Sequence, residues 1–397
     1  MEFTPASEIT HRIQGLQTIL DGLDLDGALI LQKVDLFYYT GTTQTGWLYV
    51  PAQGAPLFMV FKDLERARAE SGLDPDRIVP LLSAKKIPDT LEEFGFNLPR
   101  DLGMELDVLP ANLYLSFQLI FAPARLTDVS TEIRLQRAVK SAHELGLVRR
   151  AAAQSDLVAA QVPEIIREGM AEIELAAELE AHARRLGHQG QINMRLFDNR
   201  LFYGHILAGD QGGVPGAFSS PTSGSGLNPM IGQGPSFNTI APHQPVLVDY
   251  VFALDGYLAD HTRIFSLGPL DEDLAEAHAK MLEVQSVFAD AAGPGVVSGA
   301  LYEKMVECAV SLGLGDQFMG AAHPRIRFSG HGIGIELDEF PFIAKGQTLE
   351  LAPGMVIALE PKAVFPGRGV VGIENTFVVT ETGVEQLTLY PEAVCIL

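Results

Sequence analysis

The chain has 397 residues and a formal net charge of −22, with 28 Lys and Arg residues against 50 Asp and Glu residues. This acidic balance argues against a protein that binds the nucleic-acid backbone or an anionic membrane surface, because both require clustered Lys and Arg. The length exceeds the roughly 250–300 residues at which a single hydrophobic core stops growing. We therefore expect a folded protein of two domains, with small molecules left open as substrates.

Cysteine usage and hydropathy place further limits on the chain. The two cysteines, Cys308 and Cys395, are too few for a disulfide framework and lie in no CxxC spacing. No apolar run reaches the ~18 residues of a membrane span, and the first residues lack the basic-then-apolar pattern of a secretion signal. These features predict a cytoplasmic protein with no membrane segment.

The first third of the chain alternates short strand-like runs, at 27–32 and 47–61, with helical stretches, which predicts an α/β domain over residues 1–131. One long helical segment is expected from Thr131 to about Glu168, and its residues 132–160 form a linker helix that opens the second domain. The remainder, residues 161–397, is expected to form that domain.

The second domain begins with a helix that ends near Gly187, and further helices are expected at 271–291 and 298–312. From Gln211 to Val248 the sequence contains no Asp, Glu, Lys or Arg and is rich in Gly, Pro, Ser and Thr. A loop of this length is usually functional or disordered, so we interpret it as an active-site wall, with a surface excursion as the alternative. Strands and turns are expected from about Arg325 onward, and no phosphate-binding glycine motif is present.

A hairpin is expected around the turn-forming residues 254–256, between two β-rich runs. If the turn comprises the four residues from Ala253 to Gly256, Asp249 stands opposite Asp260. Directly opposed side chains lie about 4.5–5.5 Å apart at Cβ, and like charges there are destabilising. A bound cation would resolve that conflict.

A second hairpin is expected between MVIALE, which ends at Glu360, and VVGIENTFVV, which contains Glu374. Its turn, at residues 366–368, is centred midway between the two glutamates, so they are expected to face each other. Between the two hairpins lies FSGHGIGIELDEFP, in which flanking glycines leave the imidazole of His331 accessible and permit close backbone approach.

Each of these residues, taken singly, has an ordinary structural interpretation as a solvated carboxylate or a structural histidine. Two opposed carboxylate pairs together with one imidazole indicate a metal centre, in which four carboxylates would balance two divalent ions. Oxygen-rich ligation with one imidazole suits Mn, Co, Fe or Zn.

The segments around these five candidate ligands resemble the dinuclear metallopeptidase superfamily of prolidase, aminopeptidase P, methionine aminopeptidase and creatinase. The spacings of 11, 71, 29 and 14 residues between successive candidate ligands agree with prolidase-like members. The first third, with DLFYYTGT, is similar to the creatinase-type N-terminal domain. The resemblance implies an α/β (α+β) fold class, with an N-terminal creatinase-like domain followed by a pita-bread domain whose curved antiparallel sheet is covered by helices.

The resemblance also implies roles for the matching residues. Asp249 would bind one divalent metal ion, His331 and Glu360 the other, and Asp260 and Glu374 would bridge both. A water between the two ions would attack a peptide carbonyl, with Glu360 as general base and then acid. Family relatives are often homodimers, which is our expectation for this chain.

Two departures from the family pattern concern auxiliary histidines. Asp338 stands where the peptidases usually have a His that contacts substrate, and the second His, expected about 17 residues before Asp249, is absent from residues 229–232. Acidic Asp338 cannot donate to an oxyanion as an imidazolium would unless its pKa is raised.

Several residues are candidates to replace these histidines. His205 and His323 are the preferred catalytic candidates, Asp338 and Arg327 are candidates for substrate binding, and His261 is a further possibility. For each of them a structural or surface role is the competing interpretation.

We expect a metal-dependent exopeptidase acting on short peptides, of the Xaa-Pro dipeptidase or aminopeptidase P type. One alternative is a hydrolase or lyase acting on a small amide or zwitterion, as in creatinase relatives. Another is a binding protein that has kept the fold without catalysis.

Overall fold

The computed structural model describes residues 3–195, 197, 201–216, 220–321 and 326–397. Contacts divide the chain into two compact units, Met1–Arg137 and Ala138–Leu397. In the described ranges, no helix combines the length and hydropathy that a membrane span requires. Cys308 and Cys395 are free thiols.

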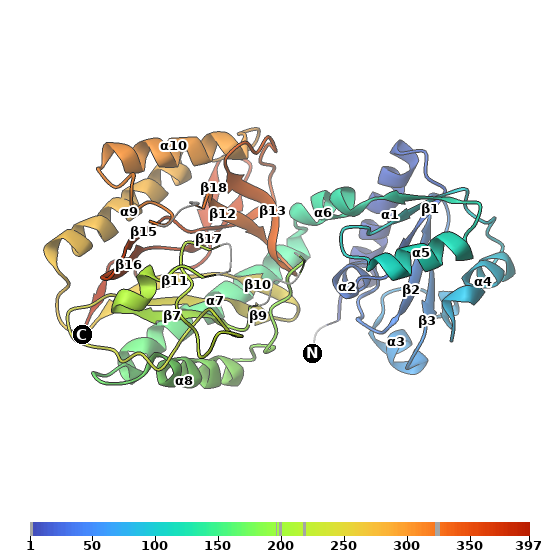
Figure 1. Ribbon diagram of the computed structural model, residues 1–397. Helices are drawn as coiled ribbons and strands as arrows, with labels where there is room; N and C mark the ends of the chain where they lie inside the picture. Colours follow the sequence, from blue (N-terminus) through green and yellow to red (C-terminus); the bar gives the residue numbers. More distant parts are fainter. Residues whose placement is uncertain (1–2, 196, 198–200, 217–219, 322–325) are drawn as a thin grey trace. The chain divides into compact units, whose positions relative to one another are not determined.

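The first unit is built on a mixed six-stranded sheet in the order β4-β3-β2-β1-β5-β6 (Figure 1). The central strand β1 pairs antiparallel with β2 and parallel with β5. Its strands are β1 (Gly27–Ile30), β2 (Gly46–Pro51), β3 (Leu57–Val60), β4 (Ile78–Pro80), β5 (Asp101–Met104) and β6 (Arg125–Asp128). Its helices are α1 (Ala6–Gly22), α2 (Lys33–Thr40), α3 (Leu64–Glu70), α4 (Ile87–Glu93) and α5 (Ala111–Ile120). A further helix, α6 (Ser130–Ala138), ends one residue beyond the last residue of this unit.

A buried ion pair fixes α6 to the first unit. Arg137 Nη1 donates to Asp35 Oδ1 at 2.7 Å, and neither side chain is more than 2% exposed. In the residue directly before it, Gln136, the side-chain Oε1 accepts from the Tyr39 hydroxyl at 2.7 Å.

The prediction of one continuous helix after Thr131 is wrong, because the structure has two helices, α6 and α7 (Ala142–Ile165). Ser141 begins the second helix with a capping box, in which its side chain accepts from the Glu144 N–H and the Glu144 side chain accepts from the Ser141 N–H. The backbone N–H of Lys140, between the helices, donates to Gly354 O instead of continuing a helix.

The second unit contains two larger sheets, in the orders β19-β11-β8-β7 and β13-β12-β14-β17-β18. Two two-stranded ladders, β9-β10 and β15-β16, extend the hairpins β8-β11 and β14-β17 with no change of register. The strands outside these hairpins are β7 (Gly204–Ala208), β12 (Phe328–Ile333), β13 (Leu337–Ala344), β18 (Val384–Gln386) and β19 (Cys395–Ile396).

Helices cover both faces of this second unit. The helices α9 (Glu272–Ala291) and α10 (Ser298–Ser311) contact β16 and β13, and the helices α7 and α8 (Glu172–Arg185) contact β9, β10 and β7. In Figure 1, α10 lies above the strands and α8 lies below them. Phe288 of α9 packs against Phe377 with ring centroids 5.8 Å apart, in a core of buried apolar side chains. The helices therefore hold the strands that carry the polar residues described next.

Candidate metal centre

The first hairpin consists of β8 (Val246–Tyr250) and β9 (Phe252–Leu254) against β10 (Tyr257–Ala259) and β11 (Thr262–Ser266). Asp255 and Gly256 both have positive φ, 49° and 90°, which favours a two-residue type I′ turn. The predicted four-residue turn is therefore wrong, and Asp249 pairs with Thr262 instead of Asp260. Asp260 still lies on the same face as Asp249, because a shift of two residues along a strand preserves the face.

The predicted register of the second hairpin is confirmed. It consists of β14 (Val356–Leu359) and β15 (Lys362–Phe365) against β16 (Gly369–Gly372) and β17 (Asn375–Val379). Leu359 pairs with Asn375, and Lys362 pairs with Gly372. Glu360 and Glu374 lie between these two paired stretches, opposite one another.

Backbone contacts bring the two hairpins and His331 together. Thr262 N–H donates to Glu374 O at 3.2 Å, and the Thr262 hydroxyl donates to Glu374 Oε2 at 2.8 Å. His331 lies on β12, opposite Ala358 of β14. A Cβ at Gly332 would come within 2.1 Å of Phe340 O, so only glycine permits this strand approach.

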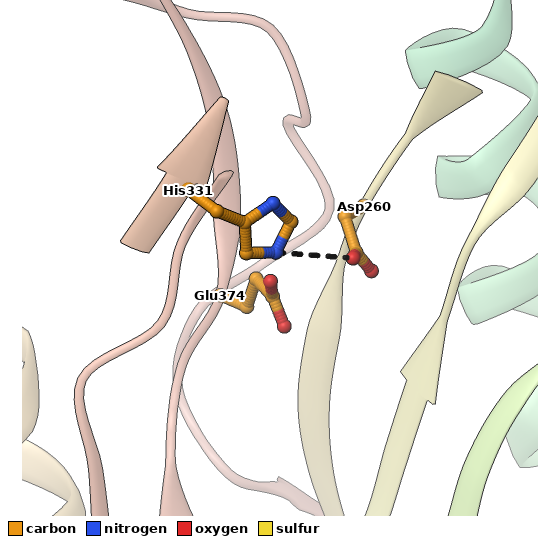
Figure 2. Close-up of side chains that lie close together, drawn as sticks. All are labelled: Asp260, His331 and Glu374. Atoms are coloured by element: carbon orange, nitrogen blue, oxygen red, sulfur yellow. Dashed lines mark ion pairs between the residues drawn. The ribbon is translucent and has the colours of Figure 1, made fainter. Parts of the chain in front are cut away.

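The imidazole of His331 is oriented by its own backbone. Nδ1 donates to Gly332 O at 3.0 Å, which leaves Nε2 to face Asp260 Oδ2 at 4.0 Å. Figure 2 shows His331, Asp260 and Glu374 converging from three different strand segments. One ligand atom from each of the three lies within 4.8 Å of the others, and all three residues are buried. An imidazole nitrogen and carboxylate oxygens so arranged fit one divalent cation.

The structure brings all five predicted ligands to one pocket. Its lining residues include Asp249, Asp260, His331, Glu360 and Glu374. Each is at most 9% exposed, so the four carboxylates lie in a buried cluster that needs compensating positive charge.

Sequence reasoning missed the cation that supplies part of this charge. Lys362 Nζ lies 2.9 Å from Asp249 Oδ2, 2.8 Å from Glu360 Oε2 and 3.1 Å from Glu374 Oε2. The signal was present, because residues two apart on a strand share a face, and Lys362 follows Glu360 at that spacing.

The proton affinities of the cluster follow from burial and mutual repulsion. Burial and the charges of Glu374 and Asp249 hold the pKa of Asp260 well above its usual value. Burial raises the pKa of Glu374 to about 7, although Lys362 opposes this. For Lys362 itself, burial lowers the pKa, but the surrounding carboxylates outweigh it and keep the amine charged.

His205 and Asp338 also line the pocket. His205, on β7, pairs with Asp249, and burial lowers the pKa of its imidazole, so it is neutral near pH 7. Asp338, whose φ is 63°, places Oδ1 3.7 Å from His331 Nδ1. The charge of Asp338, with those of Glu360 and Glu374, outweighs the effect of burial and raises the pKa of His331.

The other candidates lie elsewhere. Arg327 is exposed and is not among the residues that line the pocket. His261 is buried, and its Nδ1 lies 3.1 Å from the Ser155 hydroxyl, which makes it a packing residue. His323 lies outside the described residues. From the uncharged segment 211–248, Ser220 lines the pocket and Gln233 Oε1 lies 3.4 Å from His205 Nε2, in accord with the predicted wall.

Comparison with known families matches nearly the whole chain. A family described as metallopeptidase family M24 matches residues 146–381, and the creatinase/prolidase N-terminal domain matches residues 12–139. The chain is 27% identical over 380 residues to the Xaa-Pro dipeptidase of Pyrococcus furiosus, covering 95% of this chain and 97% of that protein. It is 26% identical over 388 residues to the uncharacterized peptidase YqhT of Bacillus subtilis, covering 97% of this chain and 100% of that protein.

Solved structures share the fold along the full length. The Xaa-Pro dipeptidase from Bacillus anthracis matches with a TM-score of 0.82 at 24% identity, covering 98% of this chain and 100% of that chain. The prolidase from Pyrococcus horikoshii matches with a TM-score of 0.79 at 23% identity, covering 96% and 99%. The predicted fold class, a creatinase-like α/β domain followed by a pita-bread domain, is confirmed.

Proposed function

The chain belongs to metallopeptidase family M24, and from this premise we propose that it is a metal-dependent exopeptidase that hydrolyses short peptides at Xaa-Pro bonds. The observation that carries the proposal is the convergence of four carboxylates and one imidazole at a single buried pocket. Relatives named Xaa-Pro dipeptidase, at 24–27% identity, support the choice of substrate.

The side chains of the pocket divide into ligands and proton carriers. Asp260, His331 and Glu374 would hold a divalent ion, which when bound lowers the pKa of a water and polarises the scissile carbonyl. Glu360 accepts the proton of the attacking water and returns it to the leaving amine. Neutral His205 keeps an N–H that can donate to the oxygen of the tetrahedral intermediate, a role the family gives to histidines that this chain lacks.

The test of this function is turnover of Xaa-Pro dipeptides and Xaa-Pro-Xaa tripeptides by the full chain, with Mn²⁺ or Co²⁺ added. Glu360→Gln is expected to lower kcat by roughly 10²–10⁴-fold, because it removes the proton acceptor. The exposed variant Glu381→Gln is the matched control and should retain wild-type turnover. Absence of hydrolysis with every peptide, by protein shown to contain metal, would reject the proposal.

A second candidate is a hydrolase or lyase for a small amide or zwitterion. The observation that favours it is Asp338, a carboxylate on the pocket wall that would attract the cationic end of such a molecule. The two candidates separate in a parallel screen, because Asp338→Asn should weaken binding of a zwitterion selectively. If wild-type protein turns over neither class and Glu360→Gln leaves metal content and a cellular phenotype unchanged, a non-catalytic binding role becomes the better interpretation.

A further inference from the structure

A buried lysine occupies the middle of the carboxylate cluster. Lys362 is 1% exposed, and its Nζ lies 2.8–3.1 Å from one oxygen each of Asp249, Glu360 and Glu374. Of these three carboxylates, Asp249 was expected to bind one metal ion, Glu360 the other, and Glu374 both. The ammonium therefore sits where a divalent cation would have to make the same contacts.

The fold provides space for this lysine and fixes its backbone. Gly372 is the residue opposite Lys362, with φ at 144°, and a Cβ there would come within 2.7 Å of Lys362 Cα and 3.2 Å of its Cγ. The carbonyl of Lys362 accepts from Met319 N–H at 2.9 Å. A side chain anchored in this way, on the face that Glu360 occupies, is directed at the cluster.

A divalent ion and the ammonium cannot share this position. Carboxylate oxygens ligate transition-metal ions at about 2.0–2.2 Å, inside the space that Nζ fills. For such an ion to enter, the ammonium would have to give up three buried ion pairs, and removal of a buried charge from its partners costs about 3–5 kcal/mol. Among the described lining residues, Asp338 is the one carboxylate outside the cluster that could receive it.

The opposite side of the cluster remains available. Asp260 is not among the carboxylates that Lys362 contacts, and Asp260, His331 and Glu374 together offer ligand atoms within 4.8 Å of each other. We propose that Lys362 acts as a fixed cation at the Asp249 side, so that this centre holds a single divalent ion, bound by Asp260, His331 and Glu374. The proposal replaces the two-ion expectation, which the count of carboxylates and the family resemblance had both suggested.

The experiment is a metal count on the full chain. Protein stripped with a chelator is titrated with Mn²⁺ or Co²⁺ and followed by calorimetry and elemental analysis. We expect about one ion per chain in the wild type and about two in Lys362→Gly and Lys362→Ala, because both variants free the second position of a two-metal site. The matched control is Lys140→Ala, which removes another buried lysine, paired with Glu339 at 3.0 Å, and should leave the count unchanged.

Thermal unfolding gives a readout independent of the count. Without metal, the two Lys362 variants contain four buried carboxylates and no ammonium, so their melting temperatures should be lower than that of the wild type. Excess metal should raise the melting temperature of each variant by more than it raises that of the wild type. Two ions per wild-type chain, no ion in the wild type, or one ion in both variants would each overturn the proposal. The one-ion proposal concerns metal binding and not the peptide substrate. If the protein binds one ion but does not cleave Xaa-Pro substrates, the proposed function is rejected and the one-ion proposal stands.

Discussion

At the metal centre, the sequence spacing of the candidate ligands predicted which carboxylates and which histidine would lie together, but it did not predict Lys362. The positions of Asp249, Asp260, His331, Glu360 and Glu374 in the sequence were enough to place all of them in one pocket. Lys362 was overlooked because a charged residue on a strand is normally assigned to solvent. Its position is set by the register of β15 against β16, which a family resemblance does not report.

A histidine outside the centre makes a pH-dependent contribution to stability. His188 is buried, its Nδ1 accepts from Gly190 N–H at 2.8 Å, and its Nε2 donates to Val251 O at 3.0 Å, which fixes the neutral form. Burial lowers the pKa of this imidazole to about 4. In the unfolded chain the pKa is near 6.5, so the unfolded state binds more protons between these two values.

We therefore expect the stability provided by His188 to be present above pH 6.5 and to be lost as the pH falls toward 4. In that window the unfolding constant should rise by up to about tenfold per pH unit from this residue alone. Urea unfolding of wild type and His188→Gln between pH 4 and 7 measures the difference in slope. Exposed His11→Gln is the control, and equal slopes for wild type and His188→Gln would contradict the assignment.

At the scale of elements, the strands that carry the candidate ligands are positioned by the turn of the first hairpin and by one buried arginine, Arg263. The Asp255-Gly256 turn shifts the partner of Asp249 by two residues from the expected register, and Asp249 and Asp260 stay on one face because an even shift preserves the face. Long-range partners could not be anticipated at all. Arg263 of β11 donates to the carbonyls of Tyr390 and Glu374 and to Asn375 Oδ1, which joins β11, β17 and the C-terminal segment.

Arg263→Met should destabilise the protein by about 3 kcal/mol, since several buried acceptors lose a charged donor at once. Because Glu374 and Thr262 lie beside this arginine, metal affinity should fall as well. Arg368→Met is the control: its ion pairs with Asp271 and Asp273 are exposed, so its loss should be at most about 1 kcal/mol. Urea unfolding compares the two, and equal losses would show that Arg263 has no special role.

At the scale of the whole molecule, chain length predicted two domains and the family resemblance predicted their folds, whereas the helix break at Ser141 needed tertiary context. The Ser141 cap is visible in the sequence as Ser-x-x-Glu, but helical periodicity continues through it. The net charge of −22 includes four carboxylates that lie in the buried pocket, so it overstates the acidity of the surface.

All candidate ligands belong to the unit Ala138–Leu397. We therefore expect bound metal to stabilise this unit and not the unit Met1–Arg137. The single tryptophan, Trp47, lies on β2 in the other unit, so its fluorescence reports that unit alone. Metal at 100 times its Kd should stabilise the second unit by about 2.7 kcal/mol, or roughly 5–10 °C. We expect chelation to shift the far-UV circular dichroism melt of the full chain while the Trp47 fluorescence melt stays in place. Equal shifts in both signals would show instead that the two units unfold together, and no shift in either would show that the pocket binds no metal.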